Sequence, residues 1–279
     1  MKKYILKQKQ NLKEVKNMNR IKIAAGDIKY GIYWNSGIIS QFLHQNVPVF
    51  LRVTGVSALL PFFISKYRKN FFGKMIEFIQ NSKVLNRYFF KDKIYEKLYN
   101  QAIALWKLNK RKQFEFESHK ELEKELKSYF GNTKIGELGD FFQIESYNIE
   151  KKEIYNFNLD ELYVDALLAS FSTPPFLKYY EYNKQKLIPS SEISLCPLNI
   201  SDIDIITSLE CSMVLPNPKN GAEILLYSFF LRKKKLFDII TKEKDILTPL
   251  KISFHSLSGA AYNNAKKIAQ TWINKNLEV

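Results

Sequence analysis

The order of apolar and polar positions predicts strands that alternate with helices. Two short apolar runs, 21–25 and 47–53, have the length of buried strands, and each ends in a turn that contains glycine. Helical spacing follows each run, over 36–45 and from about Ser57 onward, where Pro61 is tolerated because it falls in the first turn. The first part of the chain therefore predicts two strand–helix units.

The rest of the chain adds a hairpin, further helices and shorter strands. The segments FFQIESYNI and KEIYNFN flank a turn at 150–152, which is typical of a β-hairpin. Helices are also predicted over 92–130 and 160–170, and short strands over 186–188 and 203–209. A C-terminal helix is predicted with its inner face at Ala261, Ala265, Ile268 and Trp272.

These elements predict an α/β fold with a central, mostly parallel sheet that is flanked by helices. The chain has 279 residues, of which 46% are hydrophobic and 10 are glycine. It is long enough to bury a sizeable core and leaves little room for flexible linkers. Because no internal repeat is visible, we expect a basic leader over 1–20 and a single domain over 21–279.

Positive charge is concentrated in two segments. The formal net charge is +15, and the surplus of Lys and Arg lies within 1–22 and 61–112. The 61–112 segment interleaves these charges with Phe and Tyr and is predicted to be helical, so it is able to lie on anionic lipid. Two other interpretations are rings that stack on single-stranded nucleic acid, and a helical layer with its aromatic side chains in the core and its lysines in water.

Several classes of protein are excluded by what the chain lacks. Cys196 and Cys211 are too few for a disulfide framework, which favours a reducing compartment and two buried packing residues. Three histidines without a Cys or His partner at ligand spacing argue against a zinc site, and we expect no metal and no cofactor. The sequence holds no apolar run of ~18 residues, so no bilayer-spanning helix is predicted.

Two turns between a strand and a helix are candidates for chemistry. In the second, Gly55 and Ser57 form a G-x-S pattern that is able to place the serine hydroxyl at the end of the sheet, as in a nucleophile elbow. The simpler interpretation is that Ser57 is a helix N-cap. The first turn, 26–31, is either a plain polar turn or a set of backbone N–H groups that holds an oxyanion or a phosphate.

These turns and a third segment resemble the patatin-like phospholipases, a family of lipid acyl hydrolases. The segments that carry the resemblance are IKIAAGDIKYGIYWNSGIISQFL, VTGVSALLPFFISKY and the stretch from Ala169 to Phe176. The strands FFQIESYNIEKKEIYNFN and the C-terminal SGAAYNNAKKIAQTW are also similar, so the resemblance covers most of residues 20–279. It implies a three-layer patatin-like architecture.

The resemblance also implies a Ser–Asp dyad that hydrolyses a phospholipid or another acyl ester. Ser57 would be the nucleophile and Gly55 its elbow glycine. Leu59 stands where the second elbow glycine is expected, and Asp27 brings a negative charge to the place where negative charge should develop. The resemblance assigns the oxyanion-hole loop to Gly26, Asp27, Ile28, Lys29 and Gly31.

The aspartate that the family uses as a base is missing. The stretch that should carry it is KLIPSSEISLCPL, with Ser190 and Ser191 at the expected place. A serine hydroxyl is a weak nucleophile until a neighbouring base accepts its proton. Glu192 is the nearest substitute in sequence, and Asp202 and Asp204 follow it; the simpler interpretation of all three is solvated loop residues.

Three classes of function therefore compete. The first is a lipid acyl hydrolase that acts at a membrane surface. The second is a catalytically inactive relative that binds lipid or a partner through its basic surface. The third is a nucleic-acid-binding module, which charge alone favours because no signature of such a module is present. We expect an anionic membrane surface rather than nucleic acid as the partner, and a cytoplasmic protein that is peripheral on the inner face of the membrane; nothing in the sequence predicts an oligomeric state.

Overall fold

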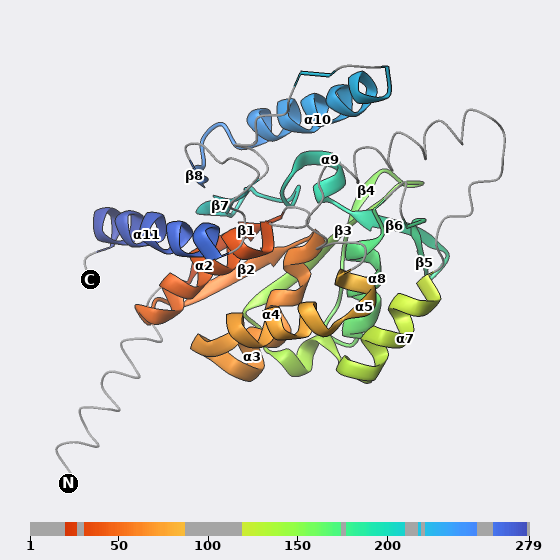
Figure 1. Cartoon of the computed structure of the whole chain (residues 1–279), viewed down its shortest axis with the longest axis horizontal. Helices are drawn as coiled ribbons and strands as arrows, with labels where there is room; N and C mark the ends of the chain where they lie inside the picture. Colours follow the sequence, from red (N-terminus) through yellow and green to blue (C-terminus); the bar gives the residue numbers. More distant parts are fainter. Residues whose placement is uncertain are drawn as a thin grey trace, which may run out of the picture.

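A computed structural model describes residues 20–26, 31–86, 119–173, 177–209, 217–218, 221–249 and 259–277. Within these ranges the chain forms an eight-stranded sheet with helices on both faces (Figure 1). The strands are β1 (Ile21–Ala25), β2 (Val49–Val53), β3 (Phe142–Asn148), β4 (Glu153–Asn156), β5 (Tyr180–Tyr182), β6 (Gln185–Pro189), β7 (Ile205–Thr207) and β8 (Asp245–Leu247).

The sheet is parallel in its centre and antiparallel at one side. Its order is β5-β6-β3-β2-β1-β7-β8, with β4 paired to β3 off this path. The pairs β1–β2, β1–β7, β2–β3 and β7–β8 are parallel, whereas β3–β4, β3–β6 and β5–β6 are antiparallel. The first half of β3 pairs with β2, and its second half extends past the end of β2 to pair with β4 and β6. The predicted mostly parallel sheet and the predicted hairpin are confirmed.

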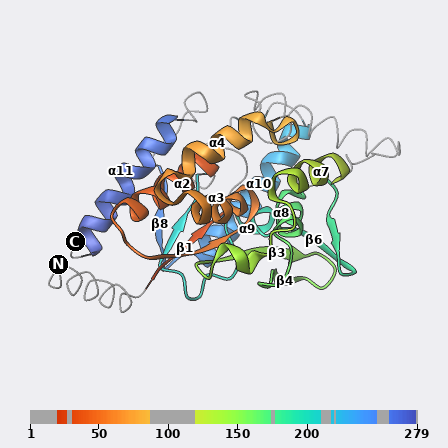
Figure 2. The ribbon, with the colours of Figure 1, turned by 90° about the horizontal axis from the view of Figure 1, so that it is seen from below.

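Helices cover the sheet on both faces and give a three-layer architecture (Figures 1 and 2). The regular helices are α2 (Gly31–His44), α3 (Leu60–Tyr67), α4 (Phe71–Asn81), α5 (Lys83–Leu85), α7 (His119–Phe130), α8 (Tyr163–Phe171), α9 (Ser191–Ser194), α10 (Gly221–Ile240) and α11 (Gly259–Asn276). The 3₁₀ helices are η1 (Gly55–Leu59), η2 (Arg68–Asn70) and η4 (Ile135–Leu138).

The two faces of the sheet differ in what they bury. Alternate residues of β1 point to opposite faces. Ile23 and Ala25 belong to the large core formed with α2, α3, α8 and α11, whereas Ala24 belongs to a small cluster with Leu195, Cys196 and Phe237 of α10. Cys196 is buried, as expected, while Cys211 lies outside the described residues.

The C-terminal helix confirms Ala261 and Ala265 of the predicted inner face but not Ile268 and Trp272. Its buried residues are Ala261, Ala265, Ala269 and Ile273, whereas Ile268 and Trp272 are only partly buried. The cause is the close approach of α2: a Cβ atom on Gly37 would lie 2.4 Å from the Tyr262 carbonyl oxygen and 2.6 Å from the Ala265 Cβ. Only small residues fit at such a contact, so the alanines face α2 and the larger side chains lie at the flank.

Helix boundaries and one whole helix also differ from the prediction. Helix α2 begins at Gly31, five residues before the predicted start, and α7 confirms the last part of the helix predicted over 92–130, of which 92–118 lies outside the described residues. Helix α10 was not predicted, because its apolar residues are not confined to one stripe of the helix.

The phenylalanines of the basic segment lie in the core or pack against it over the portion that is described, 61–86, whereas Tyr67 is 36% exposed. Phe62, Phe63, Phe71 and Phe78 are buried and pack with one another and with α7. The basic side chains of the same stretch are exposed: Lys66, Arg68, Lys69, Lys74 and Lys83. For 61–86 the interpretation as a helical layer with solvated lysines is therefore correct; the remainder, 87–112, lies outside the described residues.

Within the described ranges, none of the helices is both long and apolar enough to cross a membrane.

Candidate functional site

A buried polar cluster lies where the carboxyl ends of β1, β2 and β7 meet. We call it the Asn35 cluster; its members are Asn35, Ser57, Thr207 and the carbonyl group of Gly26, and the three side chains are completely buried. The strand order changes direction at β1: β2 and then β3 follow on one side of it, and β7 and then β8 follow on the other. In open α/β sheets this is the place where ligands bind.

Ser57 reaches the cluster through the turn after β2. Gly55 has φ of 59°, a left-handed conformation that favours glycine, and the chain then enters η1 with Ser57 at its centre. Ser57 is therefore not a helix N-cap, and the interpretation as a cap is wrong. The residue before η1 is Thr54 and the residue before α3 is Leu59, and neither side chain makes a capping bond.

The hydroxyl group of Ser57 has no carboxylate partner in the described part of the chain. Its Oγ atom donates a hydrogen bond to the Gly26 carbonyl oxygen at 2.8 Å and accepts one from Asn35 Nδ2 at 2.8 Å. A backbone carbonyl oxygen holds the proton in place but does not take it up. The geometry thus fixes Ser57 without activating it as a nucleophile.

Asn35 joins the three strands through its side-chain amide. Its Nδ2 atom also donates to the Gly26 carbonyl oxygen at 2.8 Å, and its Oδ1 atom accepts from Thr207 Oγ1 at 2.9 Å. Helix α2 therefore connects β1, the turn after β2 and β7. Sequence reasoning missed Asn35, because an asparagine within a helix carries no signal of a partner such as Thr207, which lies 172 residues away.

The glycine loop of the resemblance is described only at its two ends. A Cβ atom on Gly26 would lie 2.6 Å from the Leu195 carbonyl oxygen and 2.6 Å from the Cys196 Cα, so packing against the 195–196 backbone requires glycine there. Gly31 is buried and begins α2. Asp27, Ile28 and Lys29, the other residues predicted for an oxyanion hole, lie outside the described residues.

The segment expected to supply the base does reach the turn after β2. Strand β6 runs antiparallel to the second half of β3, and the N–H group of Ser190, the residue after β6, donates to Thr54 Oγ1 at 3.0 Å. Ser190 and Ser191 are buried, and neither offers a carboxylate. The segment thus lies beside the turn after β2, but it offers Ser57 no carboxylate as a proton acceptor.

Glu192, the nearest substitute acid in sequence, has another partner. It lies on α9, and its Oε2 atom pairs with Lys233 of α10. Its side chain is 14% exposed, so the interpretation as a solvated loop residue is wrong. The structure gives this carboxylate no hydrogen bond to Ser57 and uses it to hold α10 onto the sheet layer.

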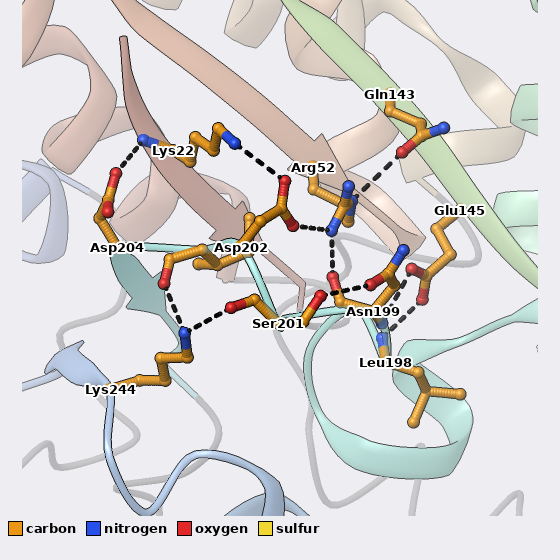
Figure 3. Close-up of polar contacts among 11 residues, drawn as sticks. Lys22, Arg52, Gln143, Glu145, Leu198, Asn199, Ser201, Asp202, Asp204 and Lys244 are labelled. Carbon is orange, nitrogen blue, oxygen red and sulfur yellow. Dashed lines mark hydrogen bonds and ion pairs between the residues drawn. The ribbon is translucent and has the colours of Figure 1, made fainter. Parts of the chain in front are cut away.

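Asp202 and Asp204 are bound to the strands on the face away from the large core. Figure 3 shows Asp202 between two cations, with Oδ1 at 2.8 Å from Arg52 Nη1 and Oδ2 at 3.0 Å from Lys22 Nζ. Partial burial acts to raise the pKa of Asp202, but these contacts outweigh it and leave the pKa lowered. Asp204 accepts the backbone N–H of Lys22 at 2.8 Å. Both are exposed, as the simpler interpretation expects, yet each is fixed by a contact to β1 or β2.

The same network contains another acid, Glu145, which sequence reasoning missed. Glu145 of β3 is completely buried, and its carboxylate accepts the N–H groups of Leu198 at 2.5 Å and Asn199 at 3.1 Å (Figure 3). Burial raises the pKa of Glu145, and these N–H groups and Arg52 oppose that shift. The carboxylate fastens the 198–204 loop to the sheet and makes no hydrogen bond to Ser57.

A second serine has a histidine partner. His119, at the start of α7, lies with Nε2 2.7 Å from Ser172 Oγ, and Ser172 Oγ donates to the Leu168 carbonyl oxygen at 2.6 Å. Ser172 is completely buried. Burial is the main cause that lowers the pKa of His119, with Glu123 acting against the shift and Lys178 adding to it.

This histidine predicts a pH dependence of stability. A native pKa below the unfolded value of about 6.5 means that the unfolded chain binds more protons between the two values. The stability from neutral His119 is therefore present above about pH 6.5 and is lost as the pH falls through the native pKa. We expect the free energy of unfolding to fall more in the wild type than in His119→Gln between about pH 7.5 and about pH 5.5.

Urea unfolding at the two pH values measures this difference. His44, whose pKa is also lowered, is present in both proteins, so its contribution cancels from the comparison. An equal loss of stability in the wild type and in His119→Gln would contradict the assignment.

Known proteins give no further guide to the site. No protein-family model matches the chain, and no curated protein matches it. Among the described residues no cluster of three or more His, Cys, Asp or Glu side chains is arranged to hold a metal ion. The resemblance therefore rests on its motifs, and the site on its geometry.

Proposed function

We propose that this chain is a patatin-like protein that does not hydrolyse acyl esters at Ser57 and that binds anionic phospholipid surfaces. One observation carries the first part. The proton of the Ser57 hydroxyl is donated to the Gly26 carbonyl oxygen rather than to a carboxylate.

No base bonds Ser57 in the described part of the chain, and this has a large chemical consequence. General base catalysis contributes typically ~10²–10⁴-fold, and a serine without it is a poor nucleophile at neutral pH. The acids considered as substitutes, Glu192, Asp202 and Asp204, each bind a cation or a backbone N–H group elsewhere. The Asn35 amide supports the same conclusion, because it donates a hydrogen bond to Ser57 Oγ and an amide is no base.

Charge supports the second part of the proposal. The chain carries +15, and Arg232 and Lys235 of α10 are among its exposed basic side chains. Each Lys or Arg close to an anionic bilayer contributes about 1 kcal/mol of attraction. Anionic phospholipid headgroups are therefore the ligand chemistry that the composition favours.

Hydrolysis by Ser57 is the competing function, because Ser190 reaches the turn that holds Ser57, as a dyad partner would. Ester turnover separates the two. We expect the wild type and Ser57→Ala to show the same turnover of p-nitrophenyl butyrate and of phosphatidylglycerol vesicles, equal to the uncatalysed rate. We also expect both to bind those vesicles equally.

Turnover that the wild type shows and Ser57→Ala loses would establish the hydrolase. Failure of the wild type to bind anionic vesicles would remove the binding function. Tight binding to single-stranded DNA, with an affinity that falls steeply with salt, would favour a nucleic-acid partner instead.

A further inference from the structure

Helix α10 exposes more apolar surface than a helix of a sheet layer needs to. Four of its large apolar side chains are exposed, and Ile239, at 62%, is the most exposed large apolar side chain among the described residues. The other three, at 44–56%, are Ile224, Phe229 and Leu231.

The helix is attached to the rest of the protein along one side. Phe237 is buried in the small cluster beneath it, Phe230 and Ile240 pack partly against that cluster, and Lys233 pairs with Glu192. Figure 1 shows α10 as the outermost element beyond α9 and β7.

Three of the four exposed apolar residues lie on the side that faces away from the sheet. Ile224, Leu231 and Ile239 are spaced seven and eight residues apart, which places them on one side of the helix, opposite to Phe230 and Phe237. The helix has 20 residues, so its outer face is long enough to lie along a surface.

Positive charge accompanies this apolar face. Arg232 and Lys235 are exposed and lie on the same outer side, beside Leu231 and Ile239. Two neighbouring lysines have acidic partners instead: Lys234 pairs with Asp238 at 3.5 Å, and Lys233 pairs with Glu192. The outer side of the helix therefore presents Arg232 and Lys235 as its exposed cations. Isoleucine and leucine flanked by Arg and Lys match the boundary between headgroups and acyl chains of an anionic bilayer. They do not match nucleic acid, because aliphatic side chains provide no stacking surface for bases.

We infer that α10 is the membrane-contacting element of this protein. It lies in the plane of an anionic bilayer surface, with Ile224, Leu231 and Ile239 inserted below the headgroups and Arg232 and Lys235 on the lipid phosphates. This inference rests on the proposed binding to anionic lipid and adds the surface that does it. Figure 1 places α3 and α4 on the opposite side of the molecule from α10, so the exposed cations of 61–86 and α10 do not meet one flat bilayer together.

Two matched pairs of variants test the surface by co-sedimentation with vesicles. Arg232→Glu and Arg68→Glu change the net charge equally, and both arginines are exposed. Arg232 lies on α10, and Arg68 lies in η2 between α3 and α4, two helices that Figure 1 shows on the opposite side of the molecule from α10. On phosphatidylcholine vesicles with about 30% phosphatidylserine, we expect Arg232→Glu to weaken binding about fivefold or more and Arg68→Glu less than twofold.

The second pair tests the apolar contact. Leu159 is 58% exposed and lies outside α10, which makes it a control for Ile224. We expect the triple variant Ile224→Ser, Leu231→Ser, Ile239→Ser to weaken binding about tenfold or more, and Leu159→Ser to bind like the wild type. Brominated lipid in the vesicle should quench the fluorescence of the tryptophan introduced by Ile239→Trp, but not that of the tryptophan introduced by Leu159→Trp.

Each outcome decides one claim. If the wild type binds the anionic vesicles but the α10 variants bind equally well, this inference is wrong and the proposed function stands. If the wild type does not bind, the proposed function fails, and the inference fails with it. A dimer in sedimentation velocity that the triple serine variant converts to monomer would overturn the inference in favour of a second copy covering α10.

Discussion

Replacing Arg52 by alanine is expected to lower the free energy of unfolding by about 3–5 kcal/mol. The side chain is 7% exposed and joins β2 to the loop that crosses the sheet: Nη1 donates to the Asn199 carbonyl oxygen and to Asp202, and Nε donates to Gln143 at 3.2 Å. Its loss would leave the Asn199 carbonyl oxygen and the Gln143 side chain without this donor, and Glu145 without its nearby cation, whereas Asp202 would keep only Lys22. Urea unfolding followed by circular dichroism measures the effect.

Arg20 supplies the control for this prediction. Its pair with Asp140, at 3.1 Å, is largely exposed, so Arg20→Ala should cost no more than about 1 kcal/mol. Arg52→Lys should fall between the two, because the charge stays while the planar set of donors is lost. Equal losses for Arg52→Ala and Arg20→Ala would show that the buried network contributes no more than a surface pair.

Replacing Phe63 by alanine is expected to cost about 3–5 kcal/mol as well. The ring is completely buried, and it contacts Phe62 with centroids 5.5 Å apart and Phe78 at 5.6 Å. The reason is the cavity left in an aromatic cluster that also includes Phe130. Thermal and urea unfolding of the variant measure the loss.

Phe229 is the matched control, since it is 44% exposed on α10. Phe229→Ala should cost about 1 kcal/mol or less. If Phe63→Ala were equally mild, the interpretation of 61–86 as a helical layer with its phenylalanines packed in the core would be contradicted.

The sequence predicts the parallel part of the sheet well, because buried strands of such a sheet are short apolar runs and glycine marks the turns that follow them. Both runs before the candidate turns are strands β1 and β2, and Gly55 adopts the left-handed conformation that the turn requires.

The contacts that decide the chemistry are not visible in the sequence, because each joins residues that are far apart along the chain. Glu192 was a candidate base on grounds of proximity in sequence, but its partner Lys233 lies on a helix that the apolar pattern did not predict. Asn35 carries no motif, although it bonds Ser57 and Thr207. Polar residues inside buried strands, such as Arg52 and Glu145, indicate a partner without naming it.

The central claim is that Ser57 is a structural residue of the Asn35 cluster and not a nucleophile. Labelling of the full chain with a fluorophosphonate probe, followed by intact mass and peptide mapping, tests this claim most directly. If Ser57 is a structural residue, we expect no adduct on it under conditions in which a known serine esterase in the same tube is fully labelled. A stoichiometric adduct on Ser57 that is absent from Ser57→Ala would contradict it.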